Sequence, residues 1–423
     1  MKSSFSYKWL LSPQVILVSL LAGMALGYFK PSWALHFEII GEMFLDSLTM
    51  CIIPLLISAS IKSVSSIMRG PSNIKTLLGI FLLIMFGTAF LGALLGILGT
   101  LGKNTTPDFL NSLGKLILSQ QKIDTHTGSA LAVFLKDLIP RNILQAIVTN
   151  ANLSILCVSI LLGLASGILP EEKTNIFLSF TNNVFEIFMT LINRIIYLLP
   201  IGLFALVSTQ VAHMGIEVVF VMSKMILLFL CACIFILFAS IFAIASVEKT
   251  KFLEVLKLYQ QALVIGFVSS SRYAALPSVL EANSKLSAKR TDEFENYFLM
   301  TLVLNPAGSA FFFSMFSVFM LGVYNHPINL EVMIVIVAGS SFCVIAMGGI
   351  PAIAAFSFFS IVANPLNIPV EVAVILLINV AYLIDPLLTL SNLCLNISVA
   401  TVLASRSRPD PNEARASVVQ RDT

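Results

Sequence analysis

Charged residues are scarce in this chain. Asp, Glu, Lys and Arg make up only 11% of its 423 residues, whereas hydrophobic residues make up 57%. A soluble domain has roughly 25% charged and 45 to 50% apolar residues. Lys and Arg are absent from the whole of 291–405, and the net charge is only +3. The composition therefore indicates a polytopic inner-membrane or plasma-membrane protein in contact with the lipid bilayer, and gives no sign of a nucleic-acid partner.

Two residue types that often carry chemistry are also few. All six cysteines lie in apolar segments, so neither a disulfide framework nor a metal cluster is predicted. An intramembrane hydrolase with a nucleophile from 269–271 would need a nearby base. The four histidines lie near predicted span ends or in loops, and the motifs His-Glu-x-x-His and Gly-x-Ser-x-Gly are absent. We therefore expect no enzyme activity, no cofactor and no bound metal.

Apolar runs long enough to cross a bilayer, about 17 to 25 residues each, recur along the chain. They lie near 14–30, 43–66, 76–100, 130–169, 183–212, 219–246, 296–323 and 372–404. The run 130–169 contains Pro140 and a polar stretch at 149–152, so we expect several short helices there. The first run is interpreted as a retained helix rather than a signal peptide. Both termini are placed in the cytoplasm, and the polar tail 406–423 is predicted to be disordered.

Two further apolar stretches have unusual flanks. Lys residues border 252–284 on both sides, so the positive-inside rule places both of its ends in the cytoplasm, and the centre at 269–277 becomes a re-entrant tip. The stretch 331–363 has no Lys or Arg at either end, and its Gly-Pro centre at 346–351 predicts a hairpin that enters from outside. Opposed hairpins are typical of inverted-repeat transporters. The alternative is that both stretches are ordinary spans.

An acidic residue, Asp385, lies within the last apolar run. A carboxylate at membrane depth costs roughly 2.5 to 3.5 kcal/mol, so it marks a functional site by default. Residues 385, 389 and 392 share one helical face. The favoured partner is Arg272, which follows the serine run 269–271 inside another apolar stretch. Together they predict a polar cavity for a zwitterion or an anion.

Purely structural roles are the alternatives for these residues. Asp385 would then pair helices, and Arg272 would snorkel or pair with Glu281 or Glu254. Amides commonly form interhelical hydrogen bonds in membranes, which gives a structural alternative for Asn305, Asn392 and Asn396.

The chain resembles the glutamate transporter homologue family, the dicarboxylate/amino acid:cation symporters, from about residue 11 to 405. The resemblance rests on short motifs in order. They are the serine-rich tip ending in Leu276-Pro277, Asn305 opening a degenerate Asn-Met-Asp-Gly-Thr, Gly349-Ile350-Pro351, Asp385 with Asn392, Pro54 in Cys51-Ile52-Ile53-Pro54, and Leu199-Pro200-Ile201-Gly202.

The resemblance implies an all-α polytopic membrane protein with eight transmembrane helices and two opposed re-entrant helical hairpins in inverted repeats. It also implies a homotrimer in which a transport core moves as an elevator against a fixed scaffold. The expected divisions are 1–75 (scaffold helices 1 and 2), 76–129 (helix 3 and its loop), 130–218 (scaffold helices 4 and 5), 219–250 (helix 6), 251–405 (transport core) and 406–423 (cytoplasmic tail).

The resemblance also implies roles for individual residues in binding a small amino acid or dicarboxylate. Asp385 would hold the substrate amino group and Asn392 its α-carboxylate. Thr389 and Ser309 would add hydroxyl contacts, and backbone groups of Gly349 and Ile350 would close the gate. The first tip would contribute the residues Ser270, Ser271 and Arg272.

Departures from the family pattern concern selectivity and coupling. Leu388 replaces the arginine that takes the second carboxylate of acidic substrates, although Arg272 fills that role from the first tip. The sequence 305–309 reads Asn-Pro-Ala-Gly-Ser, and Asn396 replaces a second acid. Sodium needs charged oxygen ligands, so Asn305, Asn392 and Asn396 form at most a degenerate cation site.

The prediction is a secondary active transporter of a small amino acid, with neutral substrates favoured over acidic ones. The coupling ion is H⁺ or Na⁺, and sodium coupling is doubtful because two acids are absent. The alternatives are a proton-coupled symporter of C4-dicarboxylates or acidic amino acids, and an uncoupled facilitator or channel.

Overall fold

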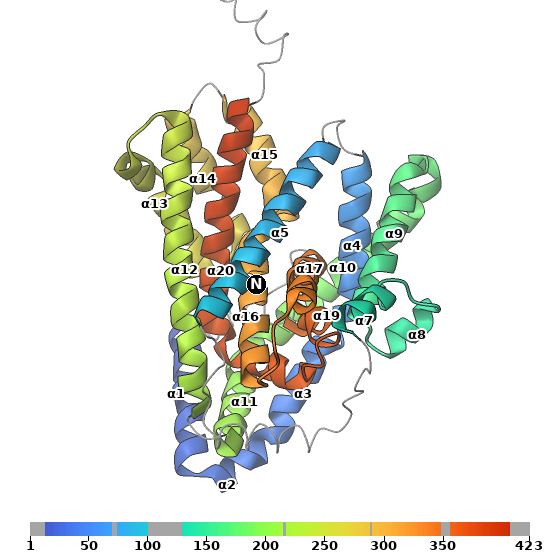
Figure 1. Ribbon diagram of the computed structural model, residues 1–423, viewed down its shortest axis with the longest axis vertical. Coiled ribbons are helices and arrows are strands. Elements are labelled where there is room, and N and C mark those ends of the chain that lie inside the picture. Colours follow the sequence, from blue (N-terminus) through green and yellow to red (C-terminus); the bar gives the residue numbers. More distant parts are fainter. Residues whose placement is uncertain are drawn as a thin grey trace, which may run out of the picture. The chain divides into compact units, whose positions relative to one another are not determined.

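The computed structural model describes residues 13–69, 74–99, 129–214, 217–287, 290–347 and 356–406. Within these ranges the regular structure is entirely helical (Figure 1). A helix satisfies its own backbone groups, which an apolar chain in lipid requires. The chain divides into two compact units, unit 1 (residues 1–231 and 306–385) and unit 2 (residues 232–305 and 386–423). Gly349, Ile350 and most of the predicted second tip lie outside the described residues.

The first helices belong to unit 1. They are α1 (Pro13–Phe29), α2 (Pro31–Ala34), η2 (Leu35–Phe37), α3 (Glu38–Thr49), α4 (Ile52–Arg69), α5 (Ile74–Leu98), α7 (Ala130–Lys136), α8 (Ile143–Val148), α9 (Asn152–Ile168), α10 (Glu171–Ile195), η3 (Ile196–Leu198) and α11 (Leu199–Met214). The later helices of this unit are α16 (Ala307–Val323), α17 (Leu330–Met347), η5 (Phe356–Phe359) and α19 (Ser360–Ala363).

Unit 2 contains α13 (Phe252–Ser269), α14 (Arg272–Leu286) and α15 (Thr291–Leu304). Two long helices, α12 (Glu217–Glu248) and α20 (Val370–Arg406), contribute to both units. The core of unit 2 is built from the facing sides of α12, α13, α14, α15 and α20, with Tyr259, Phe294 and Phe298 among its largest side chains.

Helix α16 of unit 1 is buried along its whole length, from Ala307 to Val323. It packs against α5 (Figure 1). Gly92 permits this contact, because a Cβ there would lie 2.1 Å from the carbonyl oxygen of Phe311. Thr88 Oγ1 on α5 also donates a hydrogen bond of 2.9 Å to the carbonyl of Ala307. The start of α16 is therefore fixed to α5 by both packing and a polar contact.

The segment predicted to break into short helices does so. Helix α7 ends at Lys136, α8 spans Ile143–Val148, and α9 begins at Asn152. Asn142 caps α8 by accepting from the backbone N–H of Leu144 at 2.9 Å. Asn150 adopts a left-handed backbone with φ of 52° between α8 and α9. The polar stretch at 149–152 thus supplies the turn that its composition predicts, and Asn142 supplies the cap of α8.

Seven helices of the described residues are long and apolar enough to cross a membrane, so the protein is a multi-pass membrane protein. Neither α13 nor α14 is one of them, whereas α17 is. The expected first span at 14–30 contains a shorter apolar helix at Val18–Phe29.

All six cysteines are free thiols, and Cys231 is exposed whereas Cys233 is buried.

Candidate substrate and cation site

The serine run forms a tight turn between α13 and α14, which pack against each other in unit 2 (Figure 1). Ser270 follows α13 in the left-handed region, with φ of 49° and ψ of 32°. Ser271 then caps α14, because its Oγ accepts from the backbone N–H of Ala274 at 3.3 Å. A non-glycine residue in this region costs roughly 1 to 2 kcal/mol. Such strain is found at functional sites, which makes this tip a candidate for one.

Residues of α13, α14 and α20 meet around Gly266. A Cβ at Gly266 would lie 2.7 Å from Leu393 Cδ2, 3.6 Å from Ala275 Cβ and 4.0 Å from Thr389 Cγ2. Arg272 precedes Ala275 by three residues and so shares its face of α14. The side of α14 that includes Ala275 and Arg272 therefore faces Gly266 of α13, and Thr389 of α20 lies beside the same glycine.

The side chain of Arg272 is partly buried. Glu281, a structural partner considered for it, forms an ion pair with Lys285 at 2.6 Å on the exposed surface of α14. The hydrogen bond and the charge of Lys285 lower the pKa of the Glu281 carboxyl. Lys285 thus provides a second, solvent-facing cation on the same helix for comparison with Arg272.

Two buried amides meet in unit 2. Nδ2 of Asn305 donates to Oδ1 of Asn396 at 3.3 Å, and both residues are 0% exposed. Asn305 is the C-cap of α15, where its backbone N–H donates to the carbonyl of Thr301 at 3.0 Å. Oδ1 of Asn305 and Nδ2 of Asn396 have no hydrogen-bond partner among the described residues. The pair therefore has one internal contact and two unused polar atoms in an apolar interior.

Helix α20 carries the other predicted residues of the last apolar run. Thr389 and Asn392 are buried, at 6% and 4% exposed, and Asn392 precedes Asn396 by about one turn. Leu388 is 3% exposed and packs in the same interior. Asp385 is half-buried and lies on α20 within unit 1. Pro386 follows it inside the helix, so the carbonyl of residue 382 receives no N–H from four residues ahead.

Ser309 lies in the first turn of α16, in unit 1. Its backbone N–H donates to the carbonyl of Pro306 at 3.1 Å, and the residue is 5% exposed. The structure thus brings Asn305 and Asn396 into contact, and places Ala275 of α14 and Thr389 of α20 beside Gly266. Ser309 and Asp385 belong to unit 1.

Two contacts near these residues were missing from the sequence predictions. Gly266 looked like any apolar-run glycine, although its position one helical turn before the serine run was a usable signal of close packing. Cys233 Sγ lies 3.6 Å from the carbonyl of Leu387, with the thiol as donor. That contact connects α12 to α20 within unit 2 and has no local sequence signature.

The fold and these buried polar residues define a helical, multi-pass membrane protein. Its sequence matches the sodium:dicarboxylate symporter family over residues 11–406. It is 23% identical to the proton/sodium-glutamate symport protein of Geobacillus stearothermophilus, over 95% of each chain. It is 25% identical to the proton/glutamate-aspartate symporter of Bacillus subtilis, over 84% of this chain and 85% of the relative. It is 24% identical to C4-dicarboxylate transport protein 2 of Ralstonia nicotianae, over 96% and 91%.

The chain therefore belongs to the sodium:dicarboxylate symporter family. Family members are symporters, so this protein is a membrane transport protein and not an enzyme. The family couples transport to ions and needs no further cofactor. The name of the Geobacillus stearothermophilus relative includes both the proton and sodium. The family resemblance predicted from the motifs is confirmed.

Proposed function

We propose that the protein is a proton-coupled symporter of small carboxylates with two carboxyl groups, either C4-dicarboxylates or acidic amino acids. This proposal reverses the preference for neutral amino acids that Leu388 suggested. The reason is that the relatives named above carry glutamate, aspartate or C4-dicarboxylates, while Arg272 offers a guanidinium for the second carboxylate.

The observation that carries the proposal is the approach of α13, α14 and α20 at Gly266. Around Gly266 the side of α14 that includes Arg272 packs against α13, and Thr389 of α20 lies beside the same glycine. Arg binds carboxylates in a bidentate manner. One guanidinium at this position therefore takes the place of the arginine that the family carries where this chain has Leu388. The hydroxyl of Thr389 and the amide of Asn392 then remain for the first carboxylate, with Ser270 and Ser271 completing the polar lining. Gly349 and Ile350 are assigned the gate.

The proton is proposed as the coupling ion because of the pair Asn305 and Asn396. Sodium binding favours oxygen ligands that carry charge, and these two amides are neutral and bonded to each other. Asp385 is an acid of the last apolar run that can take up and release a proton. Protonation of Asp385 would compensate one charge of a dianionic substrate during transport.

A neutral amino acid is the second candidate substrate, and Leu388 is the observation that favours it. Its buried isobutyl group would line the side-chain end of the cavity with an apolar surface. In that case Asp385 holds the substrate ammonium group, and Arg272 serves a structural role. An uncoupled facilitator is the third candidate. It is favoured by the absence of the two acids that the family carries at its cation site.

The proposed mechanism is an elevator in a homotrimer of the inner membrane, with 251–405 as the moving core and both termini cytoplasmic. It is supported by the hairpin of α13 and α14, neither of which is long and apolar enough to cross a bilayer alone. Lys249, Lys251 and Lys285 flank this hairpin at both ends, which agrees with entry and exit on the cytoplasmic side.

The test is uptake by the purified protein in liposomes with labelled succinate, aspartate, glutamate, alanine and serine. Proton and sodium gradients are imposed separately. We expect accumulation of a dianionic substrate with an inward proton gradient and no effect of sodium. Accumulation of alanine or serine alone would favour the second candidate. Sodium-driven accumulation would overturn the coupling assignment, and equilibration without any gradient dependence would indicate a facilitator.

A further inference from the structure

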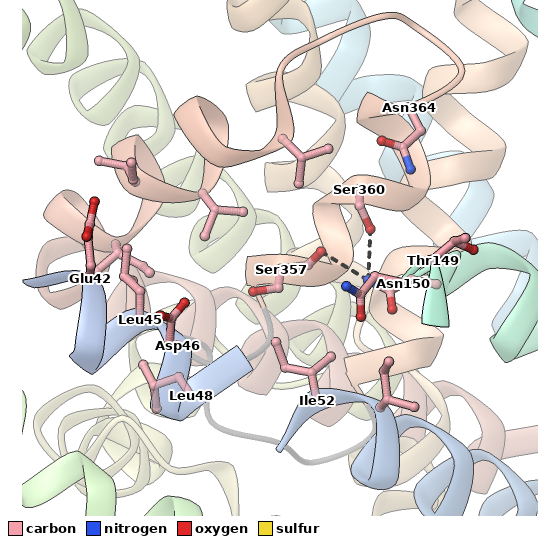
Figure 2. Close-up of a pocket in the computed structure, with 16 residues that line it drawn as sticks. Glu42, Leu45, Asp46, Leu48, Ile52, Thr149, Asn150, Ser357, Ser360 and Asn364 are labelled. Atoms are coloured by element: carbon pink, nitrogen blue, oxygen red, sulfur yellow. Dashed lines mark hydrogen bonds between the residues drawn. The ribbon is translucent and has the colours of Figure 1, made fainter. Parts of the chain in front are cut away.

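Two polar contacts join parts of unit 1 that are far apart in the sequence. The backbone N–H of Leu131, at the start of α7, donates to Oε1 of Glu331 in α17 at 2.8 Å. Nδ2 of Asn152, at the start of α9, donates to Oγ of Ser360 in α19 at 2.9 Å (Figure 2). The partners are separated by 200 and 208 residues. Both contacts therefore attach α17 and α19 to the segment that contains α7 and α9.

The contact of Glu331 is built into the first turn of α7. Ser129 caps this helix with its side chain. The N–H of Leu131 is among the donors that the start of a helix leaves without an intrahelical acceptor, and the carboxylate from α17 accepts from it. A hydrogen bond to an ionised group is stronger than a neutral one. The same two helices also meet through Phe134 and Phe342, whose ring centroids are 6.2 Å apart.

The contact of Asn152 is buried. Asn152 is 6% exposed and Ser360 is 5% exposed. Nδ2 of Asn152 also donates to the carbonyl of Ser357 at 3.4 Å, so both of its acceptors lie on the η5–α19 segment (Figure 2). A buried donor that loses its acceptors is costly. The amide therefore favours the state in which α9 and α19 stay together, unless water replaces the lost acceptors.

A cavity of about 490 Å³ adjoins this second contact. It is lined by Asn152, Ser357 and Ser360 together with Glu42 and Asp46 of α3 (Figure 2). A close-packed interface resists displacement. Beside the cavity, however, the η5–α19 segment has room to move, and water can enter to bond to a freed amide. The attachment of this segment at Asn152 is thus a polar contact at the edge of an open space.

In the proposed mechanism, 130–218 is part of the fixed scaffold and 251–405 is the moving core. The first partner of each contact lies in the scaffold, and the second lies in the core. We propose that the two contacts form a latch, which holds α17 and α19 against α7 and α9 and opens each time the core moves. This inference rests on the proposed elevator. It gives Glu331 and Asn152 the role of setting how long the attached state lasts.

The first test asks whether the two contacts open together. Hydrogen exchange at the amide of Leu131 is measured on the purified protein in phosphatidylcholine nanodiscs, without substrate. Asn152→Ala removes only the distant contact, yet exchange at Leu131 should become about fivefold faster, as expected for the loss of one hydrogen bond from a unit that opens as a whole. Ser159→Ala is the matched control on α9, because its buried hydroxyl donates to the carbonyl of Ile155 in the same helix.

Two further variants complete this test. Ser360→Ala removes the same contact from the other partner and should also accelerate exchange at Leu131. Glu331→Ala removes the acceptor of that amide and should accelerate its exchange the most. Unchanged exchange at Leu131 in Asn152→Ala would mean that the contacts open independently, which overturns the latch. An equal acceleration in Ser159→Ala would indicate general loosening of α9 and would overturn it as well.

The second test asks whether transport requires the latch to open. The Ser129 hydroxyl and the Glu331 carboxylate are hydrogen-bond partners, so the pair Ser129→Cys and Glu331→Cys places one thiol on each side. A short bifunctional methanethiosulfonate links the two thiols. Uptake of labelled succinate, aspartate, glutamate, alanine and serine into liposomes should then be lost, and should return when dithiothreitol removes the linker. The single cysteine variants receive the same treatment and show the effect of each substitution alone.

A control pair separates the linker from the latch. Glu171→Cys with Asn175→Cys places two exposed thiols one turn apart on α10, where the same linker should leave uptake unchanged. Undiminished uptake by the linked latch pair would show that the contact persists throughout the cycle, which overturns the proposal, as does a failure of the latch pair to link. If the unaltered protein carries none of the substrates, the proposed function fails, and hydrogen exchange alone decides whether the two contacts act as one latch.

Discussion

The side-chain amide of Asn305 donates to that of Asn396 across 3.3 Å in the interior of unit 2. Both residues occupy positions where related proteins are expected to carry acids or cation ligands, and both are fully buried. An uncharged pair avoids the cost of holding carboxylates in an apolar interior when no cation is bound. This arrangement is the basis for proposing the proton as the coupling ion.

Asn396→Asp should introduce sodium dependence. The new carboxylate lies beside the side-chain amide of Asn305, whose Oδ1 is an oxygen without a described partner, so a sodium ion gains a charged and a neutral ligand. We expect the melting temperature of the variant to be lowered without sodium and raised as sodium is added, because a ligand that binds only the folded state stabilises it. Thermal unfolding in choline and in sodium chloride measures both effects.

The control for that substitution is Asn283→Asp. Asn283 is another buried amide of unit 2, 1% exposed, and accepts from the Tyr259 hydroxyl at 3.4 Å. A carboxylate there should lower stability by a similar amount without any response to sodium. If Asn396→Asp behaves in the same way as this control, the site around Asn305 does not accept a cation and the interpretation of the amide pair is wrong.

Gly266→Val should weaken substrate binding and stability together. The added side chain meets Leu393 at 2.7 Å and Thr389 at 4.0 Å, so α13 must move away from α20. Overpacking of this kind costs typically about 1 to 3 kcal/mol. Gly79→Val is the matched control, since a Cβ at Gly79 in α5 meets nothing within 4 Å and both changes place a β-branched residue in a helix.

Thermal unfolding and substrate titration of the two glycine variants measure this effect. Equal behaviour of Gly266→Val and Gly79→Val would show that the close approach is unimportant. A loss of stability in Gly266→Val with unchanged substrate affinity would separate packing from the proposed site.

Local signals in the sequence predicted the local structure well. The polar stretch at 149–152 and the serine run at 269–271 each contain capping and turn residues, and each forms a break between helices. Such signals act over a few residues, so neighbouring side chains are enough to reveal them. The grouping of Asn305 with Asn396 came from the family resemblance, and the structure gives it a physical contact.

Contacts between distant segments could not be predicted from such local sequence signals. The approach of Gly266 to Leu393 and the cavity of Glu42, Asp46 and Asn152 depend on how helices pack, and apolar helices with little amphipathic pattern give few clues to their facing sides. Asp46 lines a cavity in the structure, and no local motif in the sequence indicates this. The membrane topology of the two predicted hairpins and the roles of Gly349 and Ile350 remain predictions.

Arg272→Ala should reduce transport of dicarboxylates far more than transport of neutral amino acids. Loss of a guanidinium that holds a carboxylate removes a charge-assisted contact of about 1.5 to 3 kcal/mol, equivalent to roughly 10- to 150-fold in affinity. Lys285→Ala removes an exposed cation from the same helix and should have little effect. Initial uptake rates in liposomes across a substrate panel give the comparison. A uniform loss for every substrate would assign Arg272 a structural role.

Asp385→Asn distinguishes the two classes of substrate with two carboxyl groups. An acidic amino acid needs the carboxylate for its ammonium group, so the variant should lose at least about 100-fold in affinity, in line with truncation of a buried charge pair. A C4-dicarboxylate has no ammonium group, so its binding should persist while the pH dependence of its uptake disappears with the titrating acid. Glu186→Gln, which removes an acid from α10, should change neither property. Titration of purified protein with glutamate and succinate at several pH values, followed by uptake, measures both. Unchanged glutamate affinity together with an unchanged pH profile would contradict both roles of Asp385 and leave it as a residue that pairs helices.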